Sequence, residues 1–420
     1  MWFLVFKQLL TVCSVLLAVY LVYFGVIAVA GLIKKAPKAP AAQPRKKFAC
    51  VVAARNEAAV IGNLVDSLKA QAYPAELFDI IVAPNNCTDD TEAVAQAHGA
   101  RIFNPQGPIH SKGEVLTQVV DDLILTGDYD AMCVFDADNL AGSQFLTRMN
   151  DALCSGARIA QGFRDSKNPE QTAISGCYSI CYWMLNRFYN TARAALGLSA
   201  LVNGSGFAVS TELLRELGGW HTVTMTEDYE FSAQCALYGE RVHFVPDAVI
   251  FDEQPLTFAQ SWRQRRRWTT GSLQGLQEYG FPLFRQTILR HSFVCFDMFL
   301  TFLTPFVQLF GAVLGVLAVG PMLVSGSIAL GGFVLKGLAA AILLGAAAFV
   351  LSILGTVAAA AVTVLLKKGS FSGMWRGIAA FWVFAFSHTV LTLLSFVRKE
   401  TKWLPIAHTS SKTVAELESR

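Results

Sequence analysis

The chain has 420 residues, of which 53% are hydrophobic and only 15% charged, and its mean hydropathy is +0.43. Soluble domains carry about 25% charged residues, so this composition indicates membrane spans beside one sizeable soluble domain. The net charge is only +3 and no basic stripe is interleaved with aromatic residues, which argues against nucleic acid as a partner. Nine cysteines without a CxxC pair argue against a disulfide framework or a zinc site and suit a reducing cytosol.

The chain begins with an almost unbroken apolar run over residues 8–33. This run is long enough to cross about 30 Å of hydrocarbon, and a cleaved signal peptide would have a shorter one. Residues 1–33 are therefore expected to be a retained transmembrane anchor. The next segment, residues 34–47, is rich in lysine, proline and alanine, which predicts a semi-rigid tether and, by the positive-inside rule, a cytosolic domain after it.

Strand-like and helix-like segments alternate from residue 48 to about residue 250. Buried-strand patterns cover residues 48–54, 79–83 and 131–135, and helical patterns cover residues 57–72, 89–98 and 112–125. Thr88 or Asp89 is the expected N-cap of the second helix. This alternation predicts an α/β domain with a parallel-rich sheet covered by helices on both faces, and ligands in such sheets lie at the carboxyl ends of the strands.

Polar clusters follow all three predicted strands. They are Arg55-Asn56-Glu57, Asn85-Asn86-Cys87-Thr88-Asp89 and Asp136-Ala137-Asp138. Asp136 and Asp138 are one residue apart and can turn toward one ligand. Their hard oxygen donors suit Mg²⁺ or Mn²⁺ held jointly with substrate phosphates, while the alternative is an ordinary Asp/Asn turn.

The later motifs are weaker when each is taken alone. Residues 171–196 form an aromatic-rich stretch typical of a packing helix, and Gly204-Ser205-Gly206 is typical of a tight turn. Thr226-Glu227-Asp228 has the composition of many helix starts. Four arginines near Trp268, on a helix predicted over residues 258–279, suit either a membrane-interface helix or a diphosphate clamp.

Taken together, these motifs resemble the family-2 inverting membrane glycosyltransferases of the GT-A fold, such as cellulose, hyaluronan and chitin-oligosaccharide synthases and bacterial exopolysaccharide synthases. The matching pieces, in the order of that family, are Ala54-Arg55-Asn56-Glu57, the turn at 85–91, Ser111-Lys112-Gly113, Asp136-x-Asp138, Gly204-Ser205-Gly206, Thr226-Glu227-Asp228 and Gln264-x-x-Arg267-Trp268. The resemblance covers roughly residues 48–275. It implies a cytosolic, Rossmann-like GT-A domain over residues 48–280, inserted between transmembrane helices.

The resemblance also implies roles for individual residues. Glu57, Lys112 and Asp136 would line the nucleotide pocket, and Asp138, with Asp136 beside it, would bind Mg²⁺ or Mn²⁺. Asp228, next to Glu227, would be the general base that removes a proton from the acceptor hydroxyl. Gln264, Arg267 and Trp268 would form the acceptor side, with Arg267 stabilising diphosphate charge, and Gly206 would allow the backbone to approach the substrate closely.

One position departs from the family pattern. Many relatives have an aspartate where this chain has Asn85, which can still hydrogen-bond a base edge but adds a donor and removes a charge. Asn85 is kept as a substrate-binding residue, but recognition of uracil is less secure than the sugar-transfer chemistry.

Apolar runs return over residues 281–398, at roughly 293–324, 328–366 and 376–397. The middle run is about twice the length of one span. Two helices there would give four C-terminal spans, with the basic tail (Arg398, Lys399, Lys402) in the cytosol; one helix would give three. Four is the preferred expectation, although it would place Lys367-Lys368 outside. Residues 399–420 are expected to be either a solvated tail or a gate that brings Trp403, His408 or Thr409 near the diphosphate.

The expected function is transfer of a sugar from a UDP-sugar, with UDP-glucose or UDP-N-acetylglucosamine as the plausible donors. The acceptor would be the hydroxyl of a growing polysaccharide, with possible export partner subunits. The alternative is one transfer onto a lipid acceptor, which the few polar residues of the C-terminal spans keep open. A non-catalytic nucleotide-sugar sensor or translocation subunit is disfavoured, because Asp136, Asp138 and Asp228 occur together with Arg267.

Overall fold

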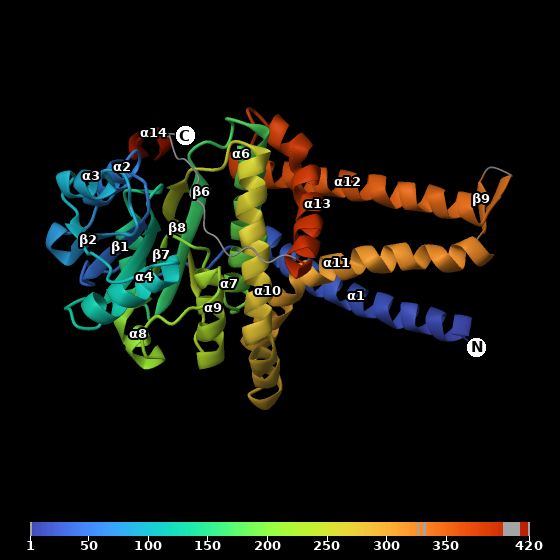
Figure 1. Cartoon of the computed structure of the whole chain (residues 1–420), viewed down its shortest axis with the longest axis horizontal. Coiled ribbons are helices and arrows are strands. Elements are labelled where there is room, and N and C mark those ends of the chain that lie inside the picture. Colours follow the sequence, from blue (N-terminus) through green and yellow to red (C-terminus); the bar gives the residue numbers. More distant parts are fainter. Residues whose placement is uncertain (1, 326, 331–332, 398–411, 419–420) are drawn as a thin grey trace.

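In the computed structural model, which describes residues 2–325, 327–330, 333–397 and 412–418, an α/β domain lies at the base of long projecting helices (Figure 1). The eight strands of its main sheet run in the order β3-β2-β1-β4-β7-β6-β8-β5. Their bounds are β1 Phe48–Ala54, β2 Phe78–Pro84, β3 Arg101–Ile102, β4 Ala131–Asp136, β5 Leu140–Ala141, β6 Ile159–Ser166, β7 Phe207–Ser210 and β8 His243–Asp252.

One half of the sheet is parallel, as the alternating pattern predicts. Strands β1, β2, β3 and β4 pair in parallel, whereas β7 is antiparallel to both of its neighbours, β4 and β6. Ala53 of β1 lies opposite both Ala83 of β2 and Asp136 of β4. The three polar clusters that follow these strands therefore meet at one edge of the sheet. The predicted α/β class, a Rossmann-like GT-A domain flanked by apolar helices, is confirmed.

Helices cover both faces of this sheet. One apolar core packs α2 (Ile61–Lys69), α3 (Thr91–Ala97) and α5 (Phe145–Cys154) on one face. The other packs α4 (Lys112–Val119), α8 (Thr211–Leu217) and α9 (Glu227–Tyr238) on the opposite face. The predicted N-cap of α3 is one or two residues early: Asp90 holds that position, although it is the Asp89 carboxylate that accepts a hydrogen bond from the backbone N–H of Thr91.

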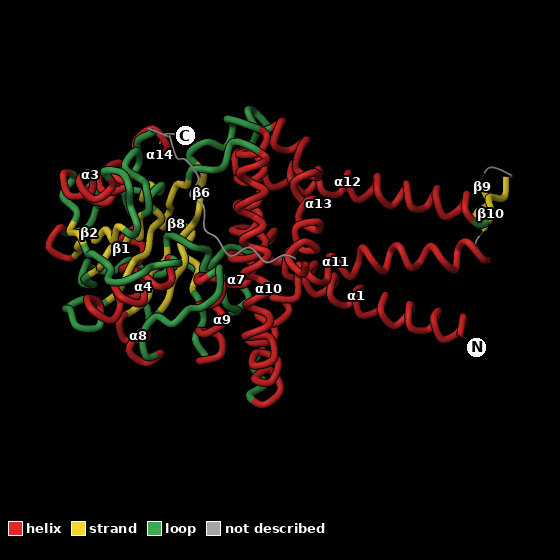
Figure 2. The backbone as a smooth tube through the Cα atoms, viewed as in Figure 1, coloured by secondary structure: helices red, strands yellow, loops and turns green. Residues whose placement is uncertain are grey.

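Two long helical segments join this domain to the apolar helices. Helix α6 (Ala173–Met184) continues through a π-helical segment, Leu185–Thr191, into α7 (Ala192–Ala195). Helix α10 (Phe258–Leu289) begins with a capping box between Thr257 and Gln260 and extends ten residues beyond the predicted end at residue 279. Its length places it along the whole boundary between the sheet domain and the projecting helices (Figure 2).

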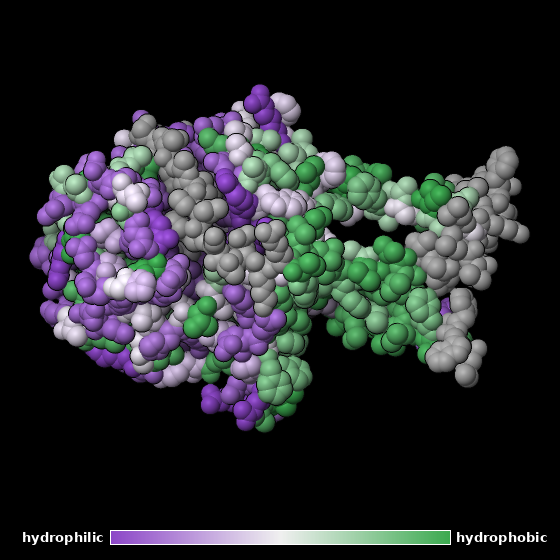
Figure 3. Space-filling model, viewed as in Figure 1, coloured by the Kyte–Doolittle hydropathy of each residue, from purple (hydrophilic) through white to green (hydrophobic). Residues whose placement is uncertain are grey.

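Four helices in the described part of the chain are long and apolar enough to cross a membrane: α1 (Trp2–Ile33), α11 (Phe293–Ser325), α12 (Leu338–Lys368) and α13 (Trp375–Val397). Helices α1, α11 and α12 project away from the sheet domain, and their visible surface is largely hydrophobic (Figure 3). A short hairpin of β9 (Ser327–Leu330) and β10 (Phe333–Lys336) joins α11 to α12.

Helix α13 differs from the other three, because it lies across their bases and alongside α10 (Figure 1). It packs against α6, α10 and α12. The backbones of α6 and α13 come so close at Gly176 and Gly377 that a Cβ on Gly176 would lie 3.0 Å from the Cα of Gly377. Helix α13 is therefore attached to the sheet domain.

After α10 the described residues contain three long apolar helices, which is one fewer than the preferred expectation of four C-terminal spans and equals the alternative of three. The middle apolar run forms a short hairpin and one helix, since residues 338–368 contain no proline to interrupt it. At the end of α12, Lys367 lies 2.7 Å from Asp165 and Lys368 pairs with Glu170. These two lysines, like the docked segment Val414–Glu418 (α14), therefore lie on the side of the sheet domain. The predicted gate residues Trp403, His408 and Thr409 lie outside the described residues.

A buried ion pair joins the projecting helices to the sheet domain. The Arg193 guanidinium of α7 binds Asp297 of α11 at 2.7 Å, and the Tyr23 hydroxyl of α1 donates to the same carboxylate at 2.8 Å. Both charged side chains are almost fully buried. Removing one partner of such a pair leaves an uncompensated buried charge.

We therefore expect Asp297→Ala to destabilise the protein by about 3–5 kcal/mol, measured as a lower thermal unfolding midpoint in detergent. Asp247→Ala is the matched control, because its pair with Lys38 is exposed and such pairs contribute little. Equal unfolding midpoints for the two variants would contradict the structural role of Asp297.

Candidate active site

The carboxyl end of β4 carries a half-buried ion pair, whose side chains are 20% and 31% exposed. The Lys112 ammonium, at the start of α4, lies 2.5 Å from the Asp136 carboxylate and donates a 2.7 Å hydrogen bond to the Gly204 carbonyl. Burial works against the charged form of Asp136, but Lys112, Arg164 and Arg267 outweigh it and lower the pKa of this carboxyl. The structure thus brings together three residues that the sequence assigns to the site: Lys112, Asp136 and Arg267.

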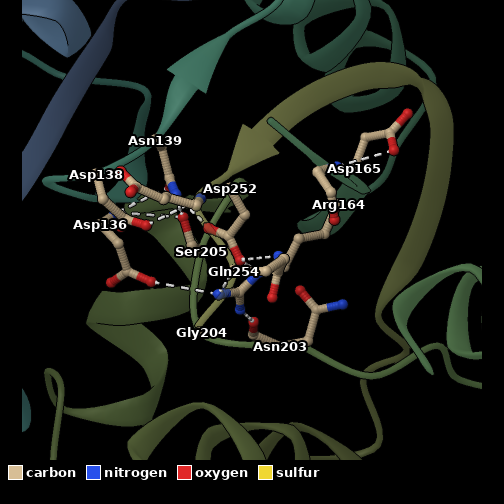
Figure 4. Close-up of polar contacts among 12 residues, drawn as sticks. Asp136, Asp138, Asn139, Arg164, Asp165, Asn203, Gly204, Ser205, Asp252 and Gln254 are labelled. Atoms are coloured by element: carbon tan, nitrogen blue, oxygen red, sulfur yellow. Dashed lines mark hydrogen bonds and ion pairs between the residues drawn. The ribbon is translucent and has the colours of Figure 1, made fainter. Parts of the chain in front are cut away.

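The largely buried Arg164 side chain lies beside Asp136 (Figure 4). The Arg164 guanidinium, from β6, binds the Asp252 carboxylate of β8 at 2.5 Å and lies 3.8 Å from the second oxygen of Asp136. It also donates to the Asn203 carbonyl at 2.5 Å and stands 4.5 Å from the centre of the Tyr182 ring. Burial raises the pKa of Asp252 to about 6, although Arg164 opposes the shift.

The loop after β4 is held by its own hydrogen bonds. The backbone N–H of Asp136 donates to the Asn139 side chain at 3.0 Å and to the Ser205 hydroxyl at 3.1 Å. The Asn139 amide in turn donates to Asp252 at 2.7 Å. Asp138 is 7% exposed, and its carboxylate accepts a 3.2 Å hydrogen bond from the N–H of Glu253. These hydrogen bonds hold both aspartates of the Asp-x-Asp motif in place, and they connect Asp136 and Asp138 to different groups.

The clusters after β1 and β2 lie at the same edge of the sheet. Arg55 donates to the side-chain oxygen of Asn85 at 2.8 Å, and the backbone N–H of Glu57 donates to the Thr91 hydroxyl at 2.8 Å. Glu57 and Asn85 are both buried. The Asn85 oxygen is thus engaged by Arg55, which leaves its amide N–H group as a donor for a ligand.

Asp228 lies at the start of α9, opposite the Gly204 turn. A Cβ on Gly204 would lie 3.3 Å from Arg164, 3.5 Å from the Asp228 carboxylate and 4.0 Å from that of Asp136. Burial, followed by the neighbouring Glu227 carboxylate, raises the pKa of Asp228 to about 7. Glu227 itself lies 3.8 Å from the Lys112 ammonium. A carboxylate with a pKa near neutrality is suited to general base catalysis.

The two glycines of the turn have different surroundings. Both have positive φ, +87° at Gly204 and +64° at Gly206. A Cβ on Gly206 would lie 2.7 Å from Ile250, so this glycine is required for packing against β8. Gly204 is the one that faces the charged groups, whereas the sequence analysis assigned substrate contact to Gly206.

Helix α10 closes the opposite side of the site. Trp268 packs edge-on against Tyr178 and Tyr182 of α6, with ring centres 5.8 and 6.4 Å apart. Tyr182 in turn contacts Arg164, so aromatic packing connects the Gln-x-x-Arg-Trp motif to the buried ion pairs. The side-chain oxygen of Gln264 is buried and has no hydrogen-bond partner among the described residues. Arg267, on the same helix, is near enough to Asp136 to help lower the pKa of that carboxyl.

The site offers few carboxylate ligands for a divalent ion. Among the described residues, no group of three or more His, Cys, Asp or Glu side chains is arranged to hold a metal. Mg²⁺ and Mn²⁺ need only one or two carboxylates when substrate phosphates supply further oxygens. Asp138 could be such a ligand, whereas Asp136 already faces Lys112 and Arg164. The two aspartates that were predicted to bind the metal together, Asp136 and Asp138, therefore have different surroundings.

Sequence reasoning missed three charged residues at this edge: Arg164, Lys167 and Asp252. Each follows or ends an apolar strand run, in Phe163-Arg164-Asp165-Ser166-Lys167 and in Ile250-Phe251-Asp252. Strands β6 and β8 are parallel neighbours that end together. The pattern used for the first three strands, a polar cluster after a buried strand, would also have identified the ends of β6 and β8.

Comparison with known proteins gives a consistent picture. The model of the family described as "Glycosyltransferase like family 2" matches residues 44–271. The probable glycosyltransferase YdaM of Bacillus subtilis is 26% identical over 281 residues, which are 64% of each chain. The β-monoglucosyldiacylglycerol synthase of Synechocystis is 25% identical over 240 residues, 56% of this chain and 50% of that protein. The chain therefore matches less than two thirds of the length of either relative.

The fold has a counterpart among solved structures. The mannosyltransferase PcManGT from Pyrobaculum calidifontis, in complex with GDP-Man and Mn²⁺, superimposes with a TM-score of 0.59. The match covers 94% of this chain and 100% of that one, at 17% sequence identity. This likeness concerns the arrangement of the backbone, including helices beyond the sheet domain.

Proposed function

The chain belongs to the glycosyltransferase like family 2, and from this premise we propose that it transfers a sugar from a UDP-sugar to the hydroxyl of a lipid acceptor at a membrane. The observation that carries the proposal is the position of the half-buried Asp228 carboxylate. It lies around Gly204 together with Arg164 and Asp136, the partner of Lys112, and its pKa is raised to about 7. The plausible donors are UDP-glucose and UDP-N-acetylglucosamine, which makes the protein a hexosyltransferase.

The donor diphosphate would lie at the strand ends near Lys112 and Arg164. Both cations are already paired with carboxylates, so they are held in place before the donor arrives. Preorganised charges of this kind stabilise the leaving group without reorganisation during the reaction. Asp138 would hold Mg²⁺ or Mn²⁺ together with donor phosphates, and such an ion would neutralise charge that develops on the departing UDP. Glu57, Asn85 and Asp136 would contact the nucleoside.

Asp228 would act as the general base. Its carboxylate takes the proton of the acceptor hydroxyl while the oxygen attacks the anomeric carbon and the bond to the diphosphate breaks. One base is sufficient, because UDP leaves as an anion and needs no proton. Attack opposite the leaving group inverts the anomeric centre. Desolvation and, to a smaller extent, Glu227 keep the pKa of Asp228 high. Arg267 would stabilise diphosphate charge from the side of α10.

The acceptor side favours a lipid. Trp268 packs in a cluster with Ala360 and Val364 of α12 and with residues of α13, so this side of the site adjoins the projecting apolar helices. Apolar side chains of α12, such as Leu351 and Leu354, are exposed. The surfaces of α12 and α11 are separated by an open slot (Figure 3). A lipid could approach through the slot with its chains among the helices and its hydroxyl near Trp268.

Extension of a polysaccharide is the second candidate. It is favoured by Trp268, a partly buried ring held edge-on by Tyr178 and Tyr182, since aromatic rings stack on sugars. In that case the slot would carry a growing chain, and export partner subunits would complete the path.

Basic residues indicate the orientation of the protein. Lys34 and Lys35 follow α1, and Lys367 and Lys368 end α12 beside Asp165 and Glu170 of the sheet domain. The positive-inside rule then favours a catalytic domain on the cytosolic side of the plasma membrane, with α1, α11 and α12 as spans and α13 at the interface. The proposed domains keep the predicted boundaries: 1–33, 34–47, 48–280, 281–398 and 399–420.

The pKa of Asp228 leads to a pH prediction. A base must be deprotonated, so kcat/KM should rise about tenfold per pH unit below a pKa of about 7 and level off above it. Initial rates of UDP release between pH 5.5 and 8.5 measure this profile. A rate that is constant down to pH 5.5 would contradict the assignment of Asp228.

The proposed function is tested by screening the purified protein against a panel of UDP-sugars in lipid nanodiscs with Mg²⁺ or Mn²⁺. We expect UDP release with one or two donors, dependent on both lipid and divalent ion. Asp247→Asn, far from the site, is the matched control for Asp228→Asn. Failure of every UDP-sugar, or equal rates for the two variants, would overturn the proposal.

A further inference from the structure

Two lysines end helix α12, and each pairs with a carboxylate of the sheet domain. Lys367 lies 2.7 Å from Asp165, near the end of β6, whereas Lys368 pairs with Glu170 in the loop beyond that strand. The Asp165 side chain is 12% exposed and that of Glu170 is 49% exposed. The Lys367 ammonium also stands 4.5 Å from the centre of the Phe163 ring of β6. Lys367 and Asp165 thus join a candidate membrane span to a strand of the site.

The Asp165 carboxylate has partners on three elements. One of its oxygens accepts a 2.7 Å hydrogen bond from the indole N–H of Trp183, in α6, and a 2.8 Å bond from the backbone N–H of Ser166, in β6. Its other oxygen binds Lys367 of α12. Trp183 is buried in an apolar cluster with side chains of α12 and α13. Helix α6, strand β6 and helix α12 therefore meet at this carboxylate.

The residues that precede Asp165 and Trp183 belong to the active site. Arg164 precedes Asp165, and its side chain points toward Asp136, while the Asp165 carboxylate points away from that group (Figure 4). Tyr182 precedes Trp183, and the centre of its ring lies 4.5 Å from the Arg164 guanidinium. Strand β6 thus contacts α6 on both sides, through Asp165 beside α12 and through Arg164 within the site. A displacement of Asp165 would move Arg164, because one peptide bond joins them.

We propose that Lys367 and Asp165 are positioning residues for Arg164, so that the seating of α12 on the sheet domain determines how tightly the donor diphosphate is bound. This role rests on the proposed function, which places the diphosphate near Arg164. When Lys367 leaves Asp165, the end of β6 loses a contact that fixes it, and a misplacement of about 1 Å is enough to impair a catalytic arrangement. Because α12 borders the slot proposed for the lipid, a lipid that shifts this helix would also change donor affinity, and such coupling is reciprocal.

The test measures binding of UDP, in the presence of Mn²⁺, to the full-length protein in nanodiscs by isothermal titration calorimetry. We expect Lys367→Met to raise the dissociation constant of UDP about tenfold. Lys368→Met is the matched control and should stay within about twofold of wild type, because it removes the same charge from the next residue but leaves Asp165 paired. Lys367→Arg should also bind UDP within about twofold of wild type, because arginine keeps the charge.

Asp165→Asn separates positioning from a simple effect of charge. Asparagine keeps the oxygen that accepts from Trp183 and Ser166 but removes the charge that Lys367 binds. By charge alone, loss of a carboxylate near the site should strengthen binding of the anionic nucleotide. Positioning predicts the opposite, a dissociation constant about tenfold above that of wild type. The double variant Lys367→Met/Asp165→Asn should show no further loss, because the two residues act as a pair.

Thermal unfolding midpoints are measured on the same samples to confirm that each variant is folded. Either single variant tests the positioning role on its own, so a failure of one to fold leaves the other. UDP binding by Asp165→Asn that equals or exceeds that of wild type would overturn the proposal, and so would equal losses in Lys367→Met and Lys368→Met. Those results leave wild-type UDP binding, and with it the proposed function, intact. A wild-type protein that binds no UDP would overturn both.

Discussion

Asp228→Asn should lower kcat by about 10²–10⁴-fold and leave donor binding nearly unchanged. Asparagine has the same shape as aspartate, but its amide cannot take up the proton that the hydroxyl of the acceptor substrate loses. The substitution also removes a charge that neighbours Glu227, so no new unpaired carboxylate is created. UDP binding by calorimetry and UDP release by a coupled assay separate the two effects. The pH profile should also lose its rise near neutrality, because the group that titrates there is gone.

Asp247→Asn should show wild-type kinetics, because its carboxylate is exposed and paired with Lys38. The role of Asp228 as the base would be contradicted by a variant that keeps more than about one tenth of the wild-type kcat, since a general base contributes at least about 10²-fold.

Arg164→Met should produce the second large loss. The guanidinium binds Asp252 and faces Asp136, and it stands where the donor diphosphate would lie. Removing one preorganised cation of this kind lowers kcat by about 10²–10³-fold. The substitution also leaves the buried Asp252 carboxylate without its charged partner, which costs about 3–5 kcal/mol of folding stability. Kinetics and thermal unfolding therefore have to be measured on the same preparations.

The double variant Arg164→Met/Asp252→Asn separates catalysis from stability. It removes the unpaired carboxylate, so the unfolding midpoint should return most of the way to the wild-type value, while kcat stays low. Recovery of both quantities together would mean that Arg164 serves only to hold the fold.

The sequence is sufficient to predict the parts of the fold that depend on local patterns. Buried-strand runs end in polar clusters at Glu57, Asn85 and Asp136, and parallel pairing brings those ends level. The antiparallel strand β7 and the pairing of β6 with β8 depend on contacts between distant segments, such as Arg164 with Asp252. Such contacts leave no periodic signal in a single sequence, so the polar ends of β6 and β8 can be recognised from the sequence but their pairing cannot.

The number of C-terminal helices shows a different limit. Hydropathy gives the length of an apolar run, but not whether the run turns back. The pairing of Lys367 with Asp165 and the close approach of Gly176 and Gly377 fix α12 and α13 against the sheet domain. These contacts place Lys367 and Lys368 on the side of the sheet domain, whereas four spans would have placed them on the opposite side of the membrane.

The most direct test of the proposed function is the identity of the product. The protein is reconstituted in liposomes made from a bacterial lipid extract and supplied with the radiolabelled form of its best UDP-sugar donor. The product is then partitioned between chloroform–methanol and water and sized by mass spectrometry. Transfer to a lipid predicts label in the organic phase, with one sugar per lipid, that is lost in Asp228→Asn. Label in a water-soluble polymer of many sugars would contradict the lipid acceptor and establish polysaccharide synthesis instead.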